Sequence, residues 1–167
     1  MSLEFGKVVK AATLPIVVLL LLSLLQNVLR AVIGLIPIIG ALGWLLYPVH
    51  VLLVCVVLVW AGHRAVKAAG MDLVGGAVTG AFSGLVIGLA DGIIGFAINF
   101  ILNILGMGVG VVASQDASTA LVSLLGGAFG TAFMAAIGVL CIFVLPVLGI
   151  VAGAICGAIG AVVAGAK

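Results

Sequence analysis

Charged side chains are scarce in this sequence, and their scarcity excludes a soluble fold. Lysine, arginine, aspartate and glutamate together supply 6% of the 167 residues, whereas hydrophobic residues supply 66%. A typical soluble domain is about one quarter charged, because most of its surface must face water. This chain has too little polar material to build such a surface. Lipid is therefore the solvent that its composition predicts.

Basic clusters, paired cysteines and catalytic signatures are also missing. The formal net charge of +2 is too small for the clustered basic face that nucleic-acid binding needs. The cysteine count of 3 is odd and contains no Cys-x-x-Cys spacing, which argues against a disulfide framework or a zinc site. Signatures of metalloproteases, serine hydrolases, phosphate loops and dinucleotide folds are absent as well. We expect no enzymatic activity, no catalytic or metal-binding residue, no cofactor and no nucleic-acid partner.

What the sequence does contain is long, continuously apolar runs. In lipid every backbone group must be paired internally, so a spanning chain forms helices or a closed barrel. Barrel strands alternate polar and apolar residues, but a run such as residues 14–29, "LPIVVLLLLSLLQNVL", does not. The sequence therefore predicts an all-α fold, a polytopic transmembrane helical bundle. We expect residues 1–167 to form a single integral membrane domain in contact with the lipid bilayer.

Run lengths and chain breakers predict between four and six spans. The first runs from about residue 11 to 29, and the second lies between the interfacial aromatic residues Trp44 and Trp60. Residues 31–43 are apolar but too short to cross, so they form a re-entrant turn, an interfacial segment or the start of the second helix. Residues 73–113 and 120–166 each exceed one crossing. Reversals at Asp91 and Gly92 and at Pro146 to Gly149 give the preferred six spans, whereas two long bent helices give four.

The basic residues predict the orientation of the chain. In the six-span arrangement five basic residues lie on one side of the membrane: Lys7, Lys10, Arg64, Lys67 and Lys167. Arg30 lies on the other side. Cytoplasmic loops are enriched in lysine and arginine, so we expect a multi-pass protein with its N-terminus in the cytoplasm. The four-span alternative keeps the same N-terminal orientation.

Glycine recurs at every fourth residue in two segments, which we call the glycine ladders. The first ladder is Gly76, Gly80, Gly84, Gly88 and Gly92, and the second contains Gly149, Gly153 and Gly157. A four-residue step places glycines on one face of a helix, where their small size lets two backbones approach closely. These segments resemble the glycine-zipper helices of many oligomeric membrane proteins. The ladders are expected to mediate helix packing, either within one chain or between chains.

A few polar residues interrupt the apolar runs. If the helix continues through Asp91, then Asp91, Asn99 and Asn103 form a polar strip that could serve an ion or a proton; otherwise Asp91 lies in an interfacial turn. Four polar residues share one helix face near the end of the first span: Ser23, Gln26, Asn27 and Arg30. Either they line an aqueous path, or the amides bond neighbouring helices while Arg30 reaches the interface. His50 is a further candidate, although a structural role is the alternative.

Arg30 and Asp91 are expected to approach the same membrane face in the six-span arrangement. Charges near the lipid boundary are costly, and pairing would offset part of that cost. We therefore predict an ion pair between Arg30 and Asp91, which would tie the first helix to the glycine-rich region.

These features lead to one preferred function and two alternatives. The preferred one is a non-enzymatic structural or accessory subunit that assembles through its glycine ladders into a homo-oligomer or a larger complex with other membrane subunits. The first alternative is a small ion, proton or solute channel or transporter that uses the carboxylate of Asp91. The second is a lipid-embedded shell protein of a virion or vesicle. A conduit needs polar side chains along a wet path, whereas a scaffold needs them paired and needs glycines at its contacts.

Overall fold

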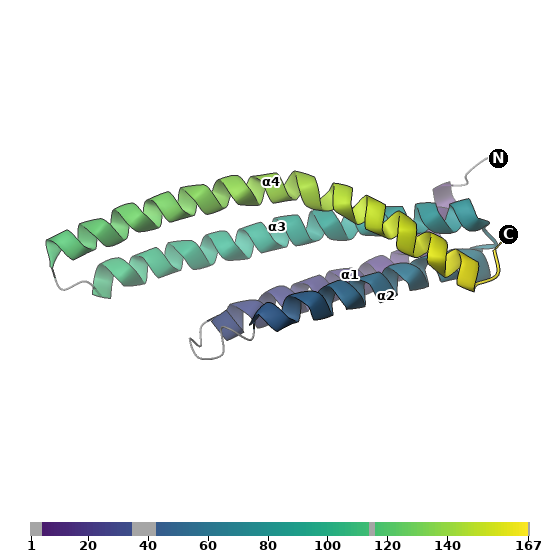
Figure 1. Ribbon diagram of the computed structural model, residues 1–167, viewed down its shortest axis with the longest axis horizontal. Helices are drawn as coiled ribbons and strands as arrows, with labels where there is room; N and C mark the ends of the chain where they lie inside the picture. The colour runs from purple at the N-terminus through teal and green to yellow at the C-terminus, as the bar shows by residue number, and fades with distance from the viewer. Residues whose placement is uncertain (1–4, 35–42, 114–115, 167) are drawn as a thin grey trace.

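The computed structural model describes residues 5–34, 43–113 and 116–166, and these residues form four long α-helices (Figure 1). In chain order the helices are α1 (Phe5–Gly34), α2 (Gly43–Ala69), α3 (Leu73–Ala113) and α4 (Ala117–Val163). By length and composition, each of the four helices can cross a membrane. The predicted all-α fold is therefore confirmed for the described residues, and four helices of this length and composition agree with a multi-pass membrane protein.

The structure corrects the preferred six-span arrangement. Helix α3 continues without a break through Asp91 and Gly92, and α4 continues through Pro146 and Gly149. A reversal inside lipid would leave backbone groups unpaired, whereas a continuous helix keeps them bonded. A proline removes only one backbone donor, which membrane helices tolerate. Residues 35–42, the main part of the predicted re-entrant or interfacial segment, lie outside the described residues.

Polar residues and one glycine define the ends of the helices near water. Helix α2 ends before Gly70, which has a φ of 64° that glycine adopts without steric cost. Asp72 accepts a hydrogen bond from the backbone N–H of Gly75 at 2.8 Å and so caps the start of α3. Asp116 caps α4 by accepting from the N–H of Thr119 at 2.6 Å, and this bond lowers the pKa of the Asp116 carboxyl.

The four helices form two antiparallel pairs of unequal length. Helices α3 and α4 lie side by side along their whole length, while the shorter α1 and α2 cover only the end that also holds both chain termini (Figure 1). At about 1.5 Å per residue, the 41 residues of α3 extend ~60 Å and the 47 residues of α4 extend ~70 Å. Each exceeds the ~30 Å hydrocarbon thickness of a bilayer. The far part of the α3–α4 pair therefore projects beyond α1 and α2.

Most of the apolar surface lies on the outside of the bundle. Between 17% and 33% of the residues in the most apolar windows of the four helices are buried. The buried apolar cluster is small and is formed by Leu19, Leu58 and Ile87 of three different helices. Such a distribution suits lipid, where association depends on close packing and not on the exclusion of water.

Helices α3 and α4 approach each other most closely at glycines. A methyl group placed on Gly84 would overlap the backbone of Gly149, and one placed on Gly80 would overlap the backbone of Gly153. Helix α2 joins the same region, because a methyl group on Gly62 would overlap the backbone of Gly157. The three backbones therefore lie too close together for any side chain at these positions.

Hydroxyl groups beside these glycines are satisfied within their own helix. Thr79 donates to the carbonyl oxygen of Gly75 at 2.8 Å, and Ser83 donates to that of Thr79 at 2.9 Å. Both side chains are fully buried. Bonding within the helix removes the cost of placing an unpaired hydroxyl group in an apolar interface.

We predict that a side chain at Gly84 destabilises the protein. Gly84→Ala should lower the thermal midpoint in detergent, and Gly84→Leu should lower it further, because both force the α3 and α4 backbones apart. Gly126→Ala is the matched control, since a methyl group there would meet nothing within 4 Å and would gain about 1 kcal/mol of helix propensity. Circular dichroism melting measures all three variants. Equal midpoints for Gly84→Leu and the parent would contradict the prediction.

Candidate functional site

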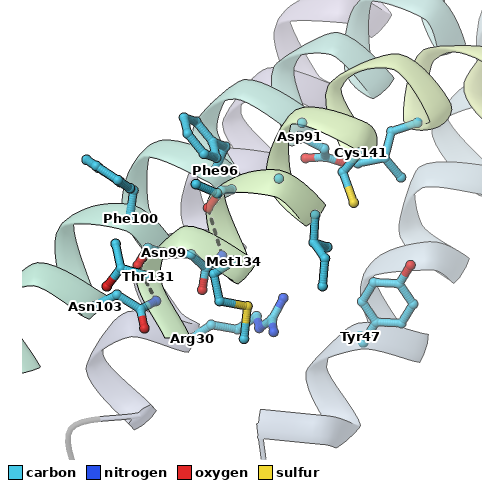
Figure 2. Close-up of a pocket in the computed structure, with 16 residues that line it drawn as sticks. Arg30, Tyr47, Asp91, Phe96, Asn99, Phe100, Asn103, Thr131, Met134 and Cys141 are labelled. Carbon is cyan, nitrogen blue, oxygen red and sulfur yellow. Dashed lines mark hydrogen bonds between the residues drawn. The ribbon is translucent and has the colours of Figure 1, made fainter. Parts of the chain in front are cut away.

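A mainly apolar cavity with several polar side chains in its lining lies between the helices where α1 and α2 reach the middle of α3 and α4. It consists of two adjoining spaces of ≈ 330 and ≈ 300 Å³. Both are lined by residues of α1, α2, α3 and α4, and Figure 2 shows the labelled side chains of the larger space. The residues common to both spaces are Arg30, Tyr47, Asp91, Gly95, Asn99 and Leu145. The volumes suit a small solute.

The carboxylate of Asp91 connects three helices in this cavity. The hydroxyl group of Ser23 in α1 donates a hydrogen bond to Asp91 Oδ1. His50 Nε2 in α2 lies 3.5 Å from Asp91 Oδ2. Ser23 is fully buried, and the His50 side chain is only 10% exposed. A carboxylate held by a hydroxyl donor and an imidazole can share or exchange a proton, which is a typical use of such groups inside membranes.

The polar strip on α3 exists because the helix does not reverse. Asp91, Gly95, Asn99 and Asn103 all line the larger space, so the alternative of an interfacial turn at Asp91 is wrong. Each asparagine donates to its own helix: Asn99 Nδ2 bonds the Gly95 carbonyl at 2.7 Å, and Asn103 Nδ2 bonds the Asn99 carbonyl at 2.8 Å. These bonds satisfy one donor of each amide and hold both side chains along the helix surface.

Arg30 lines both spaces but does not pair with Asp91. Among the residues that the structure describes, no ion pair within 4 Å and no hydrogen bond involves the Arg30 guanidinium. Figure 2 shows Arg30 and Asp91 at opposite ends of the drawn site. The predicted ion pair is therefore wrong, since Ser23 and His50 contact the two carboxylate oxygens of Asp91.

Several lining residues were not predicted from the sequence. Thr131 and Cys141 of α4 and Tyr47 of α2 line the larger space. The Oγ1 atom of Thr131 and the Oε1 atom of Gln26 are buried without a hydrogen-bond partner among the described residues. Buried polar atoms are nearly always bonded, so these two atoms are exceptions among the described residues. No sequence pattern singles out Thr131, because its helix is apolar around it.

The predicted glycine positions lie partly in the cavity wall and partly in the helix contacts outside it. Gly88, Gly92 and Gly149 line its wall, whereas Gly76, Gly80, Gly84, Gly153 and Gly157 lie in the close contacts nearer the chain termini. Within the described part of the chain, no three histidine, cysteine, aspartate or glutamate residues gather as a metal site would require. The cavity wall therefore combines polar side chains, small residues and large apolar side chains.

We predict a measurable coupling between His50 and Asp91. The single variants His50→Gln and Asp91→Asn should each lower stability in detergent. In each variant the remaining residue stays buried and loses its contact with the original partner. The double variant should lose less than the sum of the two, by about 0.6–1.7 kcal/mol. Reversible unfolding in mixed micelles measures the cycle. The control cycle combines Asn103→Ala with Asp91→Asn, and its two losses of stability should add. Strict additivity of the losses in His50→Gln and Asp91→Asn would refute the contact between these residues.

Comparisons with protein-family models, with curated proteins and with solved structures find no match to this chain. Its function must therefore be argued from the chemistry of the cavity.

Proposed function

We propose that this chain is a membrane conduit that binds a small polar solute or ion in the cavity between its four helices and carries it across the bilayer. The observation behind the proposal is the gathering of polar groups in an otherwise apolar bundle. Arg30, Asp91 and His50 come from three helices and line the same space. Ionisable residues within membrane spans usually mark substrate or proton pathways.

The surroundings of Asp91 support this proposal. Ser23 and His50 contact the carboxylate from α1 and α2, so a change in its charge would act on three helices at once. The amide groups of Asn99 and Asn103 continue the polar surface along α3. Such groups can replace part of the hydration shell of a solute that leaves water. The proposed role is non-enzymatic.

We predict that the parent protein raises the permeability of lipid vesicles to at least one small polar solute or ion. Stopped-flow light scattering with urea, glycerol, sodium propionate and potassium chloride tests the solutes, and entrapped pyranine tests protons. Asp91→Asn should reduce the rate about tenfold or more, because it disturbs the Ser23 and His50 contacts at the cavity. The protein should still assemble and elute from gel filtration like the parent.

The matched control is Asp72→Asn, which changes a carboxylate at the α3 cap and away from the cavity. Asparagine also caps helices, so this variant should conduct like the parent. If the parent vesicles behave like empty vesicles for every solute and for protons, the conduit is refuted. Equal losses in Asp72→Asn and Asp91→Asn would also count against it.

A second candidate is the structural or accessory subunit, in a homo-oligomer or with other membrane subunits. Two observations favour it: the close glycine contacts and the exposed apolar part of the α3–α4 pair, which includes Leu125, Phe129 and Phe133. Glycine ladders that serve packing would make the pair a rigid element for assembly. The ladder glycines already face one another within one chain, so assembly would use other surfaces. Native mass spectrometry in nanodiscs would reveal a stable stoichiometry or a retained partner.

We propose a cytoplasmic location for the N-terminus and for residues 63–72. The basic residues of this end include Lys7, Lys10, Arg64 and Lys67, and a positive-inside orientation follows from them.

Impermeant thiol labelling of intact cells checks this orientation in a variant without native cysteines. Ala68→Cys should stay unlabelled until the cells are opened, whereas Ser118→Cys, at the connection between α3 and α4, should react from outside. The reverse pattern would overturn the proposed orientation.

A further inference from the structure

Arg30 lines the cavity without a counter-ion among the described residues. The one carboxylate of the cavity, Asp91, already contacts Ser23 and His50. In the described part of the chain, Arg30 makes no ion pair and no hydrogen bond, although it lines both spaces. Arginine stays protonated at any ordinary pH, so deprotonation cannot remove this charge.

Arg30 lies one turn from the end of α1 with its side chain exposed, so its charge is accessible to a ligand from the cavity or from the edge of the bundle. A bound anion would offset part of the cost of holding this charge beside apolar side chains. Thr131 of α4 lines the larger space with Arg30, and its buried Oγ1 atom has no hydrogen-bond partner among the described residues.

We propose that the cavity binds an oxyanion, a carboxylate or phosphate group, through the guanidinium of Arg30 and the hydroxyl of Thr131. This inference rests on the proposed function, because it assigns a ligand class to the same cavity. The planar guanidinium group matches the two oxygens of a carboxylate or phosphate and can donate two parallel hydrogen bonds. The Thr131 hydroxyl supplies a further donor. A simple cation at Asp91 would share this carboxylate with the contacts from Ser23 and His50.

The oxyanion can come from a dissolved solute or from a lipid headgroup. Arg30 lies one turn from the end of α1, and its side chain is exposed, so a lipid phosphate could reach it at the edge of the bundle. A dissolved anion would bind within the ≈ 330 Å³ space, whose size suits a short carboxylate. Both sources share the same chemistry at Arg30.

The test uses the full purified chain, depleted of lipid, in an uncharged detergent. Isothermal titration is carried out with sodium propionate, with inorganic phosphate and with tetramethylammonium chloride as the cation probe. A separate arm adds phosphatidylglycerol and counts retained lipid by native mass spectrometry. The variants are Arg30→Gln, Arg30→Lys and Thr131→Val, and Lys67→Gln is a matched control that removes an exposed cation from the other end of the bundle.

We expect propionate or phosphate to bind the parent, and Arg30→Gln to weaken that binding about tenfold or more. Arg30→Lys should retain part of the affinity, Thr131→Val should lose a smaller part, and Lys67→Gln should match the parent. Without ligand, Arg30→Gln should melt at the same temperature as the parent or higher, because it removes an unpaired charge. A clear loss of ligand-free stability would indicate a structural role for Arg30 and would overturn the inference.

The remaining outcomes separate this inference from the proposed conduit. Arg30-dependent binding of phosphatidylglycerol alone would support the oxyanion site and refute the conduit as its purpose. Binding or transport of tetramethylammonium that depends on Asp91 and not on Arg30 would support the conduit and overturn the oxyanion site. Absence of binding by propionate, phosphate and phosphatidylglycerol would also overturn the oxyanion site, whatever the vesicle assays show.

Discussion

Polar groups in lipid have no water to bond with, and the architecture of this protein depends on that constraint. Each backbone meets it by staying helical, even through Pro146 and through Asp91 and Gly92. Side chains meet it in two ways. Thr79, Ser83 and both cavity asparagines bond their own helix, whereas Asp91 takes its partners from α1 and α2. Only the second way ties separate helices together, so Asp91 adds a polar contact between α3 and both α1 and α2, beside the apolar cluster of Leu19, Leu58 and Ile87.

The same constraint explains which parts of the fold could be predicted from the sequence. Composition and continuous apolar runs predicted helices that can cross a membrane, because few other structures satisfy a backbone in lipid. The interpretation of Asp91 and Gly92 as a turn was wrong, because turn statistics describe chains whose freed backbone groups can bond water. Inside the bundle the Asp91 carboxylate contacts Ser23 and His50, and the backbone of α3 stays bonded within the helix.

The sequence predicted some residues of the site but not how they pair. A four-residue spacing along one helix is visible in the sequence, so Asp91, Asn99 and Asn103 could be grouped before the fold was known. The partner of Asp91 could not be predicted from the sequence, because it depends on the position of α1 relative to α3 along the helix axis. Ser23 and Arg30 share one face of α1, but seven residues separate them by about 10 Å along the helix. The observed register brings Ser23 to Asp91 and leaves Arg30 without a carboxylate.

The position of the cavity follows from the place where the glycine contacts end. Near the chain termini Gly80 and Gly84 bring the backbones of α3 and α4 into direct contact, which leaves no space for a ligand. Farther along, Gly92 still lies close to the backbone of Ile142, but the next position on that face brings a large side chain. The ring of Phe96 fills the space that a methyl group on Gly138 would take, so a side chain lies between the two helices there. Gly92, Phe96 and Gly138 all line the larger space. A closely packed end and an open polar middle are therefore two results of one change along α3, from glycine to phenylalanine. Because the packed end holds the two helices together, the open part can contain polar groups without loosening the whole bundle.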